Sequence, residues 1–566
     1  MTKKIFSLAA LFVAGSLLTA CDDSFLTTKP KGVINQKALE TKQGVDALLI
    51  GAYSLLDGVG SGNTSWHSAV TNWVYGAVAS DDTYKGTDAG DQPEITFIET
   101  YNWLPTNTHF RGKWRHVYDG VARCNDVLQV MANATDMTQA EKAQVTAEAR
   151  FLRGHYHFEA KKMWNKVPYI DEKIYDPSNP ESTKIPNTED IWPKIEADFK
   201  AAYDVLPVNQ AQKGRVTKYA AAAYLAKAYL FQRKYALAKP LLDEIIASNK
   251  YTLVPLFFDN YNAATNNNAE SIFEVQMSVN DGSPGGNNGN NGNILNYPYT
   301  GPWNCCGFEQ PAQNLVNAFQ TSNGLPLLDT YNNTDVKNDE GLSSTDPFTP
   351  HTGPLDPRLD HTVGRRGIPY LDHGIHTGKP WIRDQAYGGP YSPKKAVWSK
   401  GFSHATNRNN SNNYRMIRLA HVLLWRAEVA VEENDLEKAR TMINLVRTRA
   451  ANPAGFVKMP DGTPAANYVI STYQIPFTDQ ISARKAVQFE SRLEFGMEGH
   501  RFFDLVRWGI ADQILNTYVA KEKIKRTYLN GATFKKGLNE YYPIPQAEII
   551  NSTVGGKNIL IQNPGY

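Results

Sequence analysis

The sequence predicts a mainly α-helical protein, on three observations. Apolar residues recur at helical spacing through the stretch from Gln139 to Ile170, which Pro168 brings to an end. Similar helical patterns follow in residues 220–250, 414–450 and 484–508. A spacing typical of tetratricopeptide helix pairs occurs in two of these stretches. We therefore expect a scaffold of packed helices.

The stretch that begins at Gln139 gives the longest of these patterns. Its apolar residues follow one another at intervals of three or four, which places them on one face of an α-helix. The stretch is also rich in aromatic and basic side chains, so the apolar face needs other helices to pack against. The residues on that face are Val145, Ala149, Leu152, Tyr156, Ala160 and Met163.

Two later stretches carry the tetratricopeptide pattern, in which small residues let two antiparallel helices approach closely. An alanine of the first helix is followed at the same spacing by an alanine of the second, at Ala226 and Ala238 and again at Ala427 and Ala439. The two copies are not adjacent in the chain, so they do not predict a regular solenoid. The other matching positions are Leu225, Tyr229, Tyr235 and Leu242 in the first copy and Leu423, Ala430, Leu436 and Ile443 in the second.

One long region interrupts the helical pattern. Residues 255–413 are rich in Pro, Gly and Asn, and the segment DGSPGGNNGNNGN within them contains no hydrophobic residue. A loop region of this length inside a compact protein is usually functional. We predict a helical scaffold at about 36–254 and 414–566, with residues 255–413 as an irregular insertion. Earlier in the scaffold, helical patterns occupy residues 38–56, 72–80 and 114–131, with polar loops at 57–66 and 81–105.

The first residues of the chain predict export and a lipid anchor. Lys3 and Lys4 precede an apolar run that is too short to span a membrane, which is typical of a secretory signal over residues 1–20. Leu18-Thr19-Ala20-Cys21 resembles a bacterial lipobox, which implies that Cys21 becomes the acylated first residue of the mature chain. The acidic residues that follow it resemble the surface-export signal of Bacteroidetes lipoproteins. An ordinary signal with an incidental cysteine is the alternative.

Composition and motifs argue against several classes of function. Lys and Arg (59) nearly balance Asp and Glu (57) and form no long basic run, so we expect no nucleic-acid partner. No HExxH, paired CxxC, GxSxG, P-loop or EF-hand motif occurs, so we assign no catalytic residue, metal ligand or cofactor. With Cys21 lipidated, three cysteines remain, and an odd count argues against a disulfide framework. We expect Cys305 and Cys306 to be packed thiols, with a vicinal disulfide as the alternative.

Residues suited to a sugar ligand gather in four segments. An aromatic ring stacks on the C–H face of a sugar, and Asp, Asn and Arg side chains bind neighbouring hydroxyls. Three loops place Trp beside Asp or Asn, namely residues 57–66, 81–103 and 297–310. Residues 364–391 add arginines and further aromatic rings. For each tryptophan, burial against the scaffold is the alternative.

From these segments we select ten candidate glycan-binding residues. Trp103 has no helical spacing around it, so we expect it at the edge of a pocket. Asp81 and Asp82 are consecutive, so on an extended backbone at most one of them should face inward. Arg365 and Tyr391 could close the opposite wall. The full set is Asp57, Trp66, Asp81, Asp82, Trp103, Trp303, Cys306, Arg365, Arg366 and Tyr391.

Several segments together resemble a known family. AEARFLRGHYHFEAKKMWNKVPYI, RLEFGMEGHRFFDLVRWG, YPIPQAEIINS and QNPGY match the RagB/SusD-type outer-membrane nutrient-binding lipoproteins, over essentially the whole mature chain except the insertion. The resemblance implies a single SusD-like domain over residues 21–566, with tetratricopeptide-type helix pairs on one side and the insertion on the other. It also implies a glycan site on the loops before the helix at Trp114 and in the insertion.

The resemblance favours a non-catalytic lipoprotein on the outer-membrane surface. Such a protein captures oligosaccharide or polysaccharide and delivers it to a SusC-type TonB-dependent transporter. A secreted glycoside hydrolase on a helical scaffold is the main alternative, because two carboxylates across a cleft cannot be recognised by counting. A helical-repeat module that binds only protein is a third possibility. The segments NWVYGAVASDDTYKG and DPRLDHTVGRRGIPYLD resemble a subset of the family associated with plant or microbial polysaccharides, which implies a ligand such as a fructan.

Overall fold

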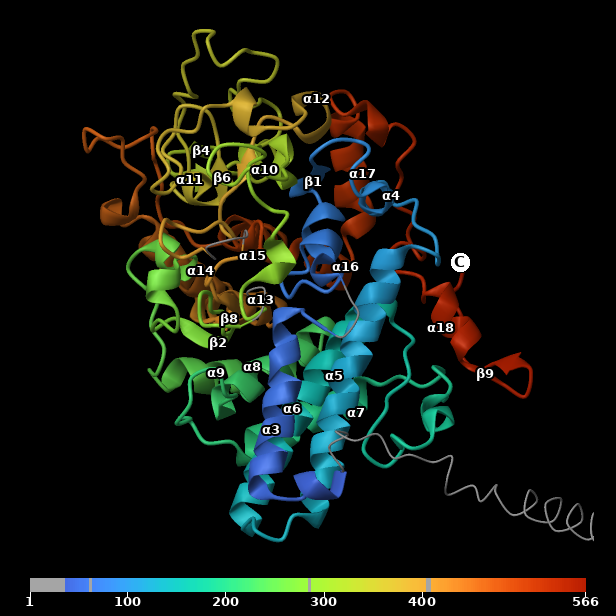
Figure 1. Cartoon of the computed structure of the whole chain (residues 1–566). Helices are drawn as coiled ribbons and strands as arrows, with labels where there is room; N and C mark the ends of the chain where they lie inside the picture. The colour runs from blue at the N-terminus through green and yellow to red at the C-terminus, as the bar shows by residue number, and fades with distance from the viewer. Residues whose placement is uncertain (1–35, 61–63, 284–286, 404–408) are drawn as a thin grey trace, which may run out of the picture.

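The computed structural model describes residues 36–60, 64–283, 287–403 and 409–566, so the predicted signal and Cys21 lie outside the described residues. Helices dominate this part of the chain and lie mainly outside the insertion, which confirms the predicted mainly α-helical fold (Figure 1). The longer helices are α3 (Lys42–Ser54), α4 (Pro93–Glu99), α5 (Thr108–Asn133), α6 (Gln139–Trp164), α7 (Trp192–Val205), α8 (Lys218–Phe231), α9 (Tyr235–Ala247), α13 (Leu419–Glu432), α14 (Leu436–Ala450), α15 (Gln480–Phe495), α16 (Arg501–Trp508) and α17 (Ala511–Glu522).

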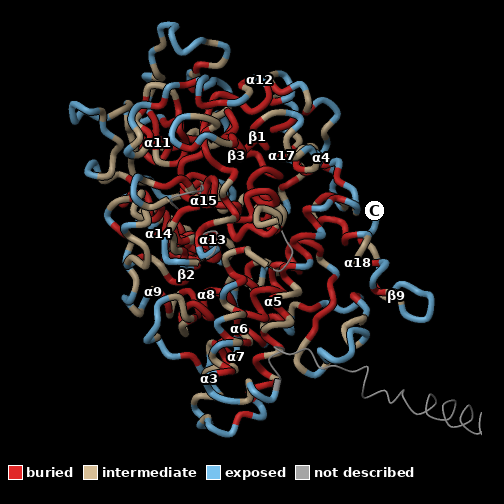
Figure 2. Tube along the Cα trace, in the orientation of Figure 1, coloured by how far each residue is buried: buried red, intermediate tan, exposed pale blue. Residues whose placement is uncertain are grey.

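Helix α6 lies at the centre of the N-terminal scaffold. Thr138 and Glu141 form a capping box at its start, which satisfies backbone N–H groups that have no partner inside the helix. Its last fourteen residues, 151–164, are all buried, because α5 and α7 pack along it (Figure 2). The helix ends at Trp164, before Pro168, where Asn165 takes a positive φ of 58°.

Two antiparallel helix pairs stand where the tetratricopeptide spacing predicts them. Helix α8 packs on α9, and α13 packs on α14. The four alanines singled out in the sequence, Ala226, Ala238, Ala427 and Ala439, are all fully buried. Helix α13 also packs on α9, which joins the two pairs into one scaffold although the insertion separates them in the chain (Figure 1).

The insertion is irregular in its described part and has small cores of its own. Its helices are only four to six residues long: α10 (Gln313–Ala318), α11 (Leu359–Thr362) and α12 (Gln385–Gly388). One apolar cluster surrounds Leu315 and Leu359, and another consists of aromatic rings around Trp303. These clusters hold the insertion together without long elements of secondary structure.

Short antiparallel strand pairs tie distant segments together. Strand β1 (Thr83–Gly86) pairs with β3 (Phe308–Pro311), and β2 (Ser271–Val275) pairs with β8 (Tyr414–Arg418). Figure 1 shows β1 and α4 beside α17, near the opposite end of the sequence. The remaining elements are β4 (Thr321–Ser322) with β5 (Leu325–Pro326), β6 (Val363–Gly364) with β7 (Ser392–Pro393), β9 (Thr553–Val554) with β10 (Lys557–Asn558), and helix α18 (Gln546–Asn551). No helix in the described part of the chain combines the length and the apolar character that a membrane span needs.

Candidate functional site

Three of the four predicted binding segments meet on one surface. The β1–β3 pairing joins the 81–103 segment to the 297–310 segment, and Thr87 N–H donates to Gly307 O at 2.5 Å. Tyr299 N–H in turn donates to Trp381 O at 2.9 Å, which brings in the 364–391 segment. These three segments therefore lie together, although none of the side chains that meet there is among the ten candidates selected from the sequence.

An aromatic ring, a guanidinium and two carboxylates come together where the segments meet. The Arg383 guanidinium lies over the Tyr299 ring, 5.4 Å from its centroid. Its two terminal nitrogens bind Asp88 Oδ2 and Asp91 Oδ2, each at 2.7 Å, and NH1 also donates to Thr87 Oγ1 at 2.9 Å. We call Thr87, Asp88, Asp91, Tyr299 and Arg383 the Tyr299 surface.

The Tyr299 surface is partly open to solvent and rests on a glycine. The side chains of Arg383, Asp88 and Asp91 are each about one-third exposed (31%, 33% and 32%). Gly307 has a positive φ of 81°, and a Cβ placed there would lie within 4 Å of Thr87, Tyr299 and Arg383. Its backbone therefore lies directly against these three residues. The ring and the charged groups are thus presented together, which is what recognition of a sugar requires, whereas Thr87 is buried beneath them and accepts from Arg383.

A buried aromatic cluster supports this surface. Trp303 is 3% exposed and packs edge-on against Trp381 and Tyr370. The neighbouring Cys305 and Cys306 form a vicinal disulfide, which corrects the expectation of two packed thiols. Trp303 and Cys306 are both buried, so they support the loop that carries Tyr299 rather than facing solvent.

Asp81 and Asp82 are both buried, contrary to the expectation that at most one of them faces inward. Arg501 Nε and NH2 bind Asp81 at 2.8 and 3.1 Å, and Arg492 Nε binds Asp82 Oδ1 at 2.9 Å. Arg492 also binds Asp81 Oδ2 at 3.0 Å. Two arginines from the C-terminal helices thus neutralise both carboxylates, which makes their burial possible.

Trp103 is also a core residue, which corrects its expected place at the edge of a pocket. It is 3% exposed, and its ring lies 4.8 Å from the Tyr542 ring and 5.9 Å from the Tyr101 ring. Its indole N–H donates to Tyr566 Oη at 2.6 Å. Tyr542 and Tyr566 come from the C-terminus, so spacing around Trp103 in the sequence could not reveal them.

The three candidates of the 364–391 segment have structural contacts of their own. Arg365 is buried and binds Asp360 through two nitrogens, at 2.6 and 2.8 Å. Tyr391 is buried and donates to Gln313 Oε1 at 3.0 Å. Arg366 is half-buried and donates to backbone carbonyls of residues 343–346. None of these side chains belongs to the Tyr299 surface.

Asp57 and Trp66 lie in a different place. Asp57 lines a groove of about 630 Å³ between the end of α3, residues 212–215 and residues 274–278. Burial raises the pKa of its carboxyl to about 7, although Val59 N–H donates to Oδ1 at 2.6 Å. Trp66 is half-buried and packs against the main core. These two residues are not part of the Tyr299 surface.

A histidine pair in the scaffold resembles a metal site but has the wrong hydrogen bonds for one. Ligand atoms of His421, Glu498 and His500 lie within 4.8 Å of one another. However, Nδ1 of His421 accepts the backbone N–H of Arg418 at 3.2 Å, so in the neutral ring Nε2 carries the proton. That proton points to His500 Nε2 at 3.3 Å, and Lys395 holds Glu498 at 2.8 Å.

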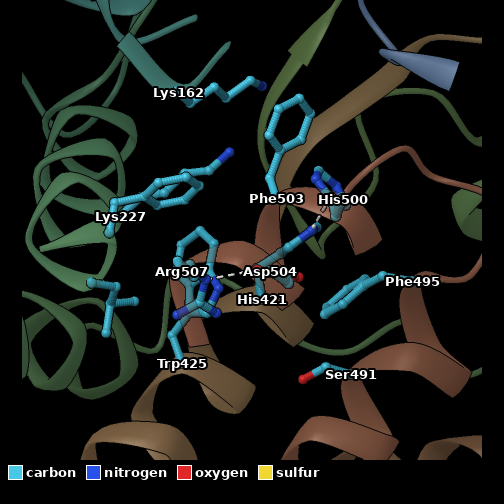
Figure 3. Close-up of a pocket in the computed structure, with 12 residues that line it drawn as sticks. Lys162, Lys227, His421, Trp425, Ser491, Phe495, His500, Phe503, Asp504 and Arg507 are labelled. Atoms are coloured by element: carbon cyan, nitrogen blue, oxygen red, sulfur yellow. Dashed lines mark hydrogen bonds and ion pairs between the residues drawn. The ribbon is translucent and has the colours of Figure 1, made fainter. Parts of the chain in front are cut away.

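The electrostatics and the space around this pair agree with a structural role. Burial lowers the pKa of His500 to about 4 and that of His421 well below its usual value. Figure 3 shows the adjoining cavity, where Lys162, Lys227 and Arg507 lie around the histidines. The cavity has a volume of about 20 Å³. This space suits a water molecule and is too small for a sugar ring.

Comparison with known proteins identifies the family. The model described as "SusD family" matches residues 269–566, which is more than half of the chain, and the model described as "Starch-binding associating with outer membrane" matches residues 24–230. The chain belongs to the SusD family. The resemblance seen in the sequence motifs is thereby confirmed.

Individual SusD-family proteins are distant in sequence and similar in fold. The chain is 23% identical to a SusD-like protein of Bacteroides ovatus, over 96% of this chain and 94% of that one. It is 24% identical to the starch-binding protein SusD of Bacteroides thetaiotaomicron, over 100% and 99% of the two chains. Surface glycan-binding protein A of Bacteroides thetaiotaomicron, solved with laminarihexaose, superposes with a TM-score of 0.67 at 22% identity, covering 92% of this chain and 99% of that one. At these identities the structural likeness establishes the fold alone.

The five residues of the Tyr299 surface in this SusD-family chain come from candidate segments but are not among the ten candidate residues. Tyr299, Asp91 and Arg383 were not selected, although each lies in a candidate segment. The available signal was proximity in sequence, because Arg383 follows Trp381 by two residues and Asp91 follows Asp88 by three. Nothing in the sequence showed that Trp303 and Trp381 face inward while Tyr299 remains half-exposed.

Proposed function

We propose that this SusD-family protein is a non-catalytic glycan-binding protein and that the Tyr299 surface contacts the ligand. The observation that carries the proposal is the grouping of the Tyr299 ring with Arg383, Asp88 and Asp91 on a partly exposed surface. A ring for stacking and charged groups for hydroxyls are the two elements of sugar recognition. Relatives described as binding starch and laminarihexaose support the same class of ligand.

The glycoside hydrolase alternative has less support from this geometry. A glycosidase needs one carboxyl group that can donate a proton to the leaving group, and a second one placed across the scissile bond. Asp88 and Asp91 instead bind the two terminal nitrogens of one guanidinium. Such an arrangement suits ligand binding, because both carboxylates are fixed in place by the same cation.

The proposal includes a lipid anchor and a transporter partner. The lipobox-like Leu18-Thr19-Ala20-Cys21 supports acylation at Cys21 and a place on the outer-membrane surface. A tethered binder without catalysis needs a recipient for its ligand, and a SusC-type TonB-dependent transporter is the recipient that the family resemblance implies. Tethering raises the effective concentration, so this contact need not be strong in isolation. Co-purification of a large outer-membrane partner from native membranes tests this part.

Calorimetry with a panel of oligosaccharides tests glycan binding. The panel contains gluco-oligosaccharides and inulin-type fructans, since the sequence suggested a fructan. We expect micromolar to millimolar affinity for one member, because an exposed site gains little from desolvation. Release of reducing ends by the wild-type protein would replace this proposal with the hydrolase. Asp57 and Trp66 lie outside the Tyr299 surface and form the alternative place for the ligand, which Trp66→Ala tests.

A further inference from the structure

The guanidinium of the Tyr299 surface is already paired with two carboxylates. Both terminal nitrogens of Arg383 bind a carboxylate at 2.7 Å, and one of them also donates to Thr87 Oγ1. A carboxylate or sulfate on a ligand would compete for Arg383 with Asp88 and Asp91, which already offset the charge of the guanidinium. With one guanidinium and two carboxylates, the five residues of the surface carry a formal charge of −1.

The nearest lysine of the same segment points its charge inward. Lys85 is buried, and its amine donates to the backbone carbonyls of Asp88 and Asp91, each at 2.7 Å. It also lies over the Tyr387 ring, 4.8 Å from the centroid. Lys85 therefore fixes the loop that carries the two carboxylates, and its charge is not presented to a ligand.

Two polar atoms of the surface remain available for a ligand. Within the described residues, Asp91 Oδ1 has no hydrogen-bond donor and Arg383 Nε has no acceptor. The surface thus offers an acceptor on Asp91 and a donor on Arg383, whose guanidinium lies over the Tyr299 ring. A pair of sugar hydroxyls can use both atoms, because each hydroxyl both donates and accepts.

We infer that the Tyr299 surface selects neutral glycans and disfavours uronate-containing or sulfated ones. This inference rests on the proposed function and adds the chemical class of its ligand. A neutral hydroxyl donates to Asp91 Oδ1, whereas an anionic group beside the same oxygen is repelled by it. The one cation among the five residues already has two carboxylate partners, so an anionic ligand gains less from charge-assisted bonds to it.

A binding panel of two polymer classes tests the inference on the soluble mature protein. The neutral probes are laminarin, dextran and inulin, and the acidic probes are alginate, polygalacturonate and chondroitin sulfate. We expect binding to a neutral probe, changed less than about twofold between about 0.05 and about 0.5 M NaCl. Acidic probes should bind at least about tenfold more weakly at the lower salt concentration.

Single variants test the preference for neutral glycans separately from the presence of a binding site. Asp91→Asn keeps the shape of the side chain and removes its charge, so the preference for neutral over acidic probes should fall several-fold. Asp204→Asn, which changes an exposed carboxylate paired with Lys200 on α7, is the matched control and should preserve the preference. Lys379→Ala examines the exposed lysine that lies four residues before Arg383 and should leave neutral binding unchanged.

The outcomes distinguish this inference from the proposed function. Neutral binding that Tyr299→Ala weakens, together with a preference that Asp91→Asn reduces, supports both. Tight binding of an acidic probe that Tyr299→Ala weakens overturns the neutral selection and leaves the glycan-binding function standing. If no probe of either class binds, or if Tyr299→Ala leaves binding unchanged, the proposed surface fails and the inference fails with it.

Discussion

Asp81 and Arg501 form a two-point ion pair across 420 residues of sequence, with nitrogen–oxygen distances of 2.8 and 3.1 Å. The pair fixes the segment before β1 to the start of α16, and Arg492 of α15 adds a second cation to the same carboxylate. Strand β1 leads directly into Thr87 and Asp88 of the Tyr299 surface. The C-terminal helices therefore help to position a surface formed by much earlier residues.

Breaking this pair should destabilise the protein without removing the ligand contacts. Asp81→Ala leaves Arg501 and Arg492 without their shared carboxylate in a buried place, which should cost ~3–5 kcal/mol of unfolding free energy. Asp204→Ala removes a carboxylate from an exposed pair and should cost no more than ~1 kcal/mol. Chemical denaturation of both variants measures the difference. Equal stability of the two variants would show that the Asp81 pair contributes little.

The same carboxylate should make the protein sensitive to acid. Burial acts to raise the pKa of Asp81, but Arg492 and Arg501 outweigh it and hold the pKa at about 2, below the usual ~3.9 of an unfolded chain. Between these two values the unfolded state binds more protons, so this contribution to stability is present above about pH 4 and is lost towards pH 2. Asp81→Asn should therefore approach wild-type stability as the pH falls. A stability difference that stays constant from about pH 5 to about pH 2 would contradict this assignment.

Trp103 should matter for stability and not for ligand affinity. Trp103→Ala removes a buried ring and the hydrogen bond to Tyr566, which should cost ~3–5 kcal/mol. Trp103→Phe keeps a ring in the same place and should cost less. Thermal unfolding gives the stability, and calorimetry with the bound oligosaccharide gives the affinity. An unchanged melting temperature with weakened binding would return Trp103 to the ligand site.

The scaffold could be predicted from the sequence because its signals are local. The apolar face of α6 and the paired alanines at Ala226 and Ala238 depend on spacing within a few turns of helix. The end of the helix predicted from Pro168 is also a local signal, although the helix already ends at Trp164. Such features need no knowledge of distant partners.

Whether an individual candidate residue faces the core or the solvent depends on partners far away in the sequence. Asp81 and Asp82 are polar and consecutive, which is typical of a loop. They are buried because Arg492 and Arg501 of the C-terminal helices bind them. Trp103 is buried against Tyr542, and the buried Tyr391 donates to Gln313, which lies 78 residues earlier in the chain. A composition argument finds segments rich in suitable side chains, but it does not tell which of them the tertiary packing leaves exposed.

Membrane attachment should depend on Cys21 alone. This cysteine stands at the end of the lipobox-like Leu18-Thr19-Ala20-Cys21, and a thioether-linked diacylglycerol with an N-acyl chain gives stable anchoring at ~0.8 kcal/mol per buried CH₂. Cys21→Ala should therefore give a soluble protein, or one that is processed elsewhere. Fractionation in cells that lack the transporter partner measures attachment. Continued recovery in washed membranes would rule out Cys21 as the anchor.

Tyr299 and Trp66 distinguish the two places where a glycan could bind. Tyr299→Ala removes the ring beside Arg383 and should weaken binding by about five- to tenfold, because an aromatic contact contributes ~1 kcal/mol or more beyond its buried area. Tyr299→Phe keeps the ring and should retain most of the affinity. Trp66→Ala changes a half-buried ring outside the Tyr299 surface and should leave binding unchanged. Calorimetry on all three variants, with circular dichroism as the control for folding, decides between the places. Loss of affinity in Trp66→Ala but not in Tyr299→Ala would move the site to the loop that contains Asp57 and Trp66.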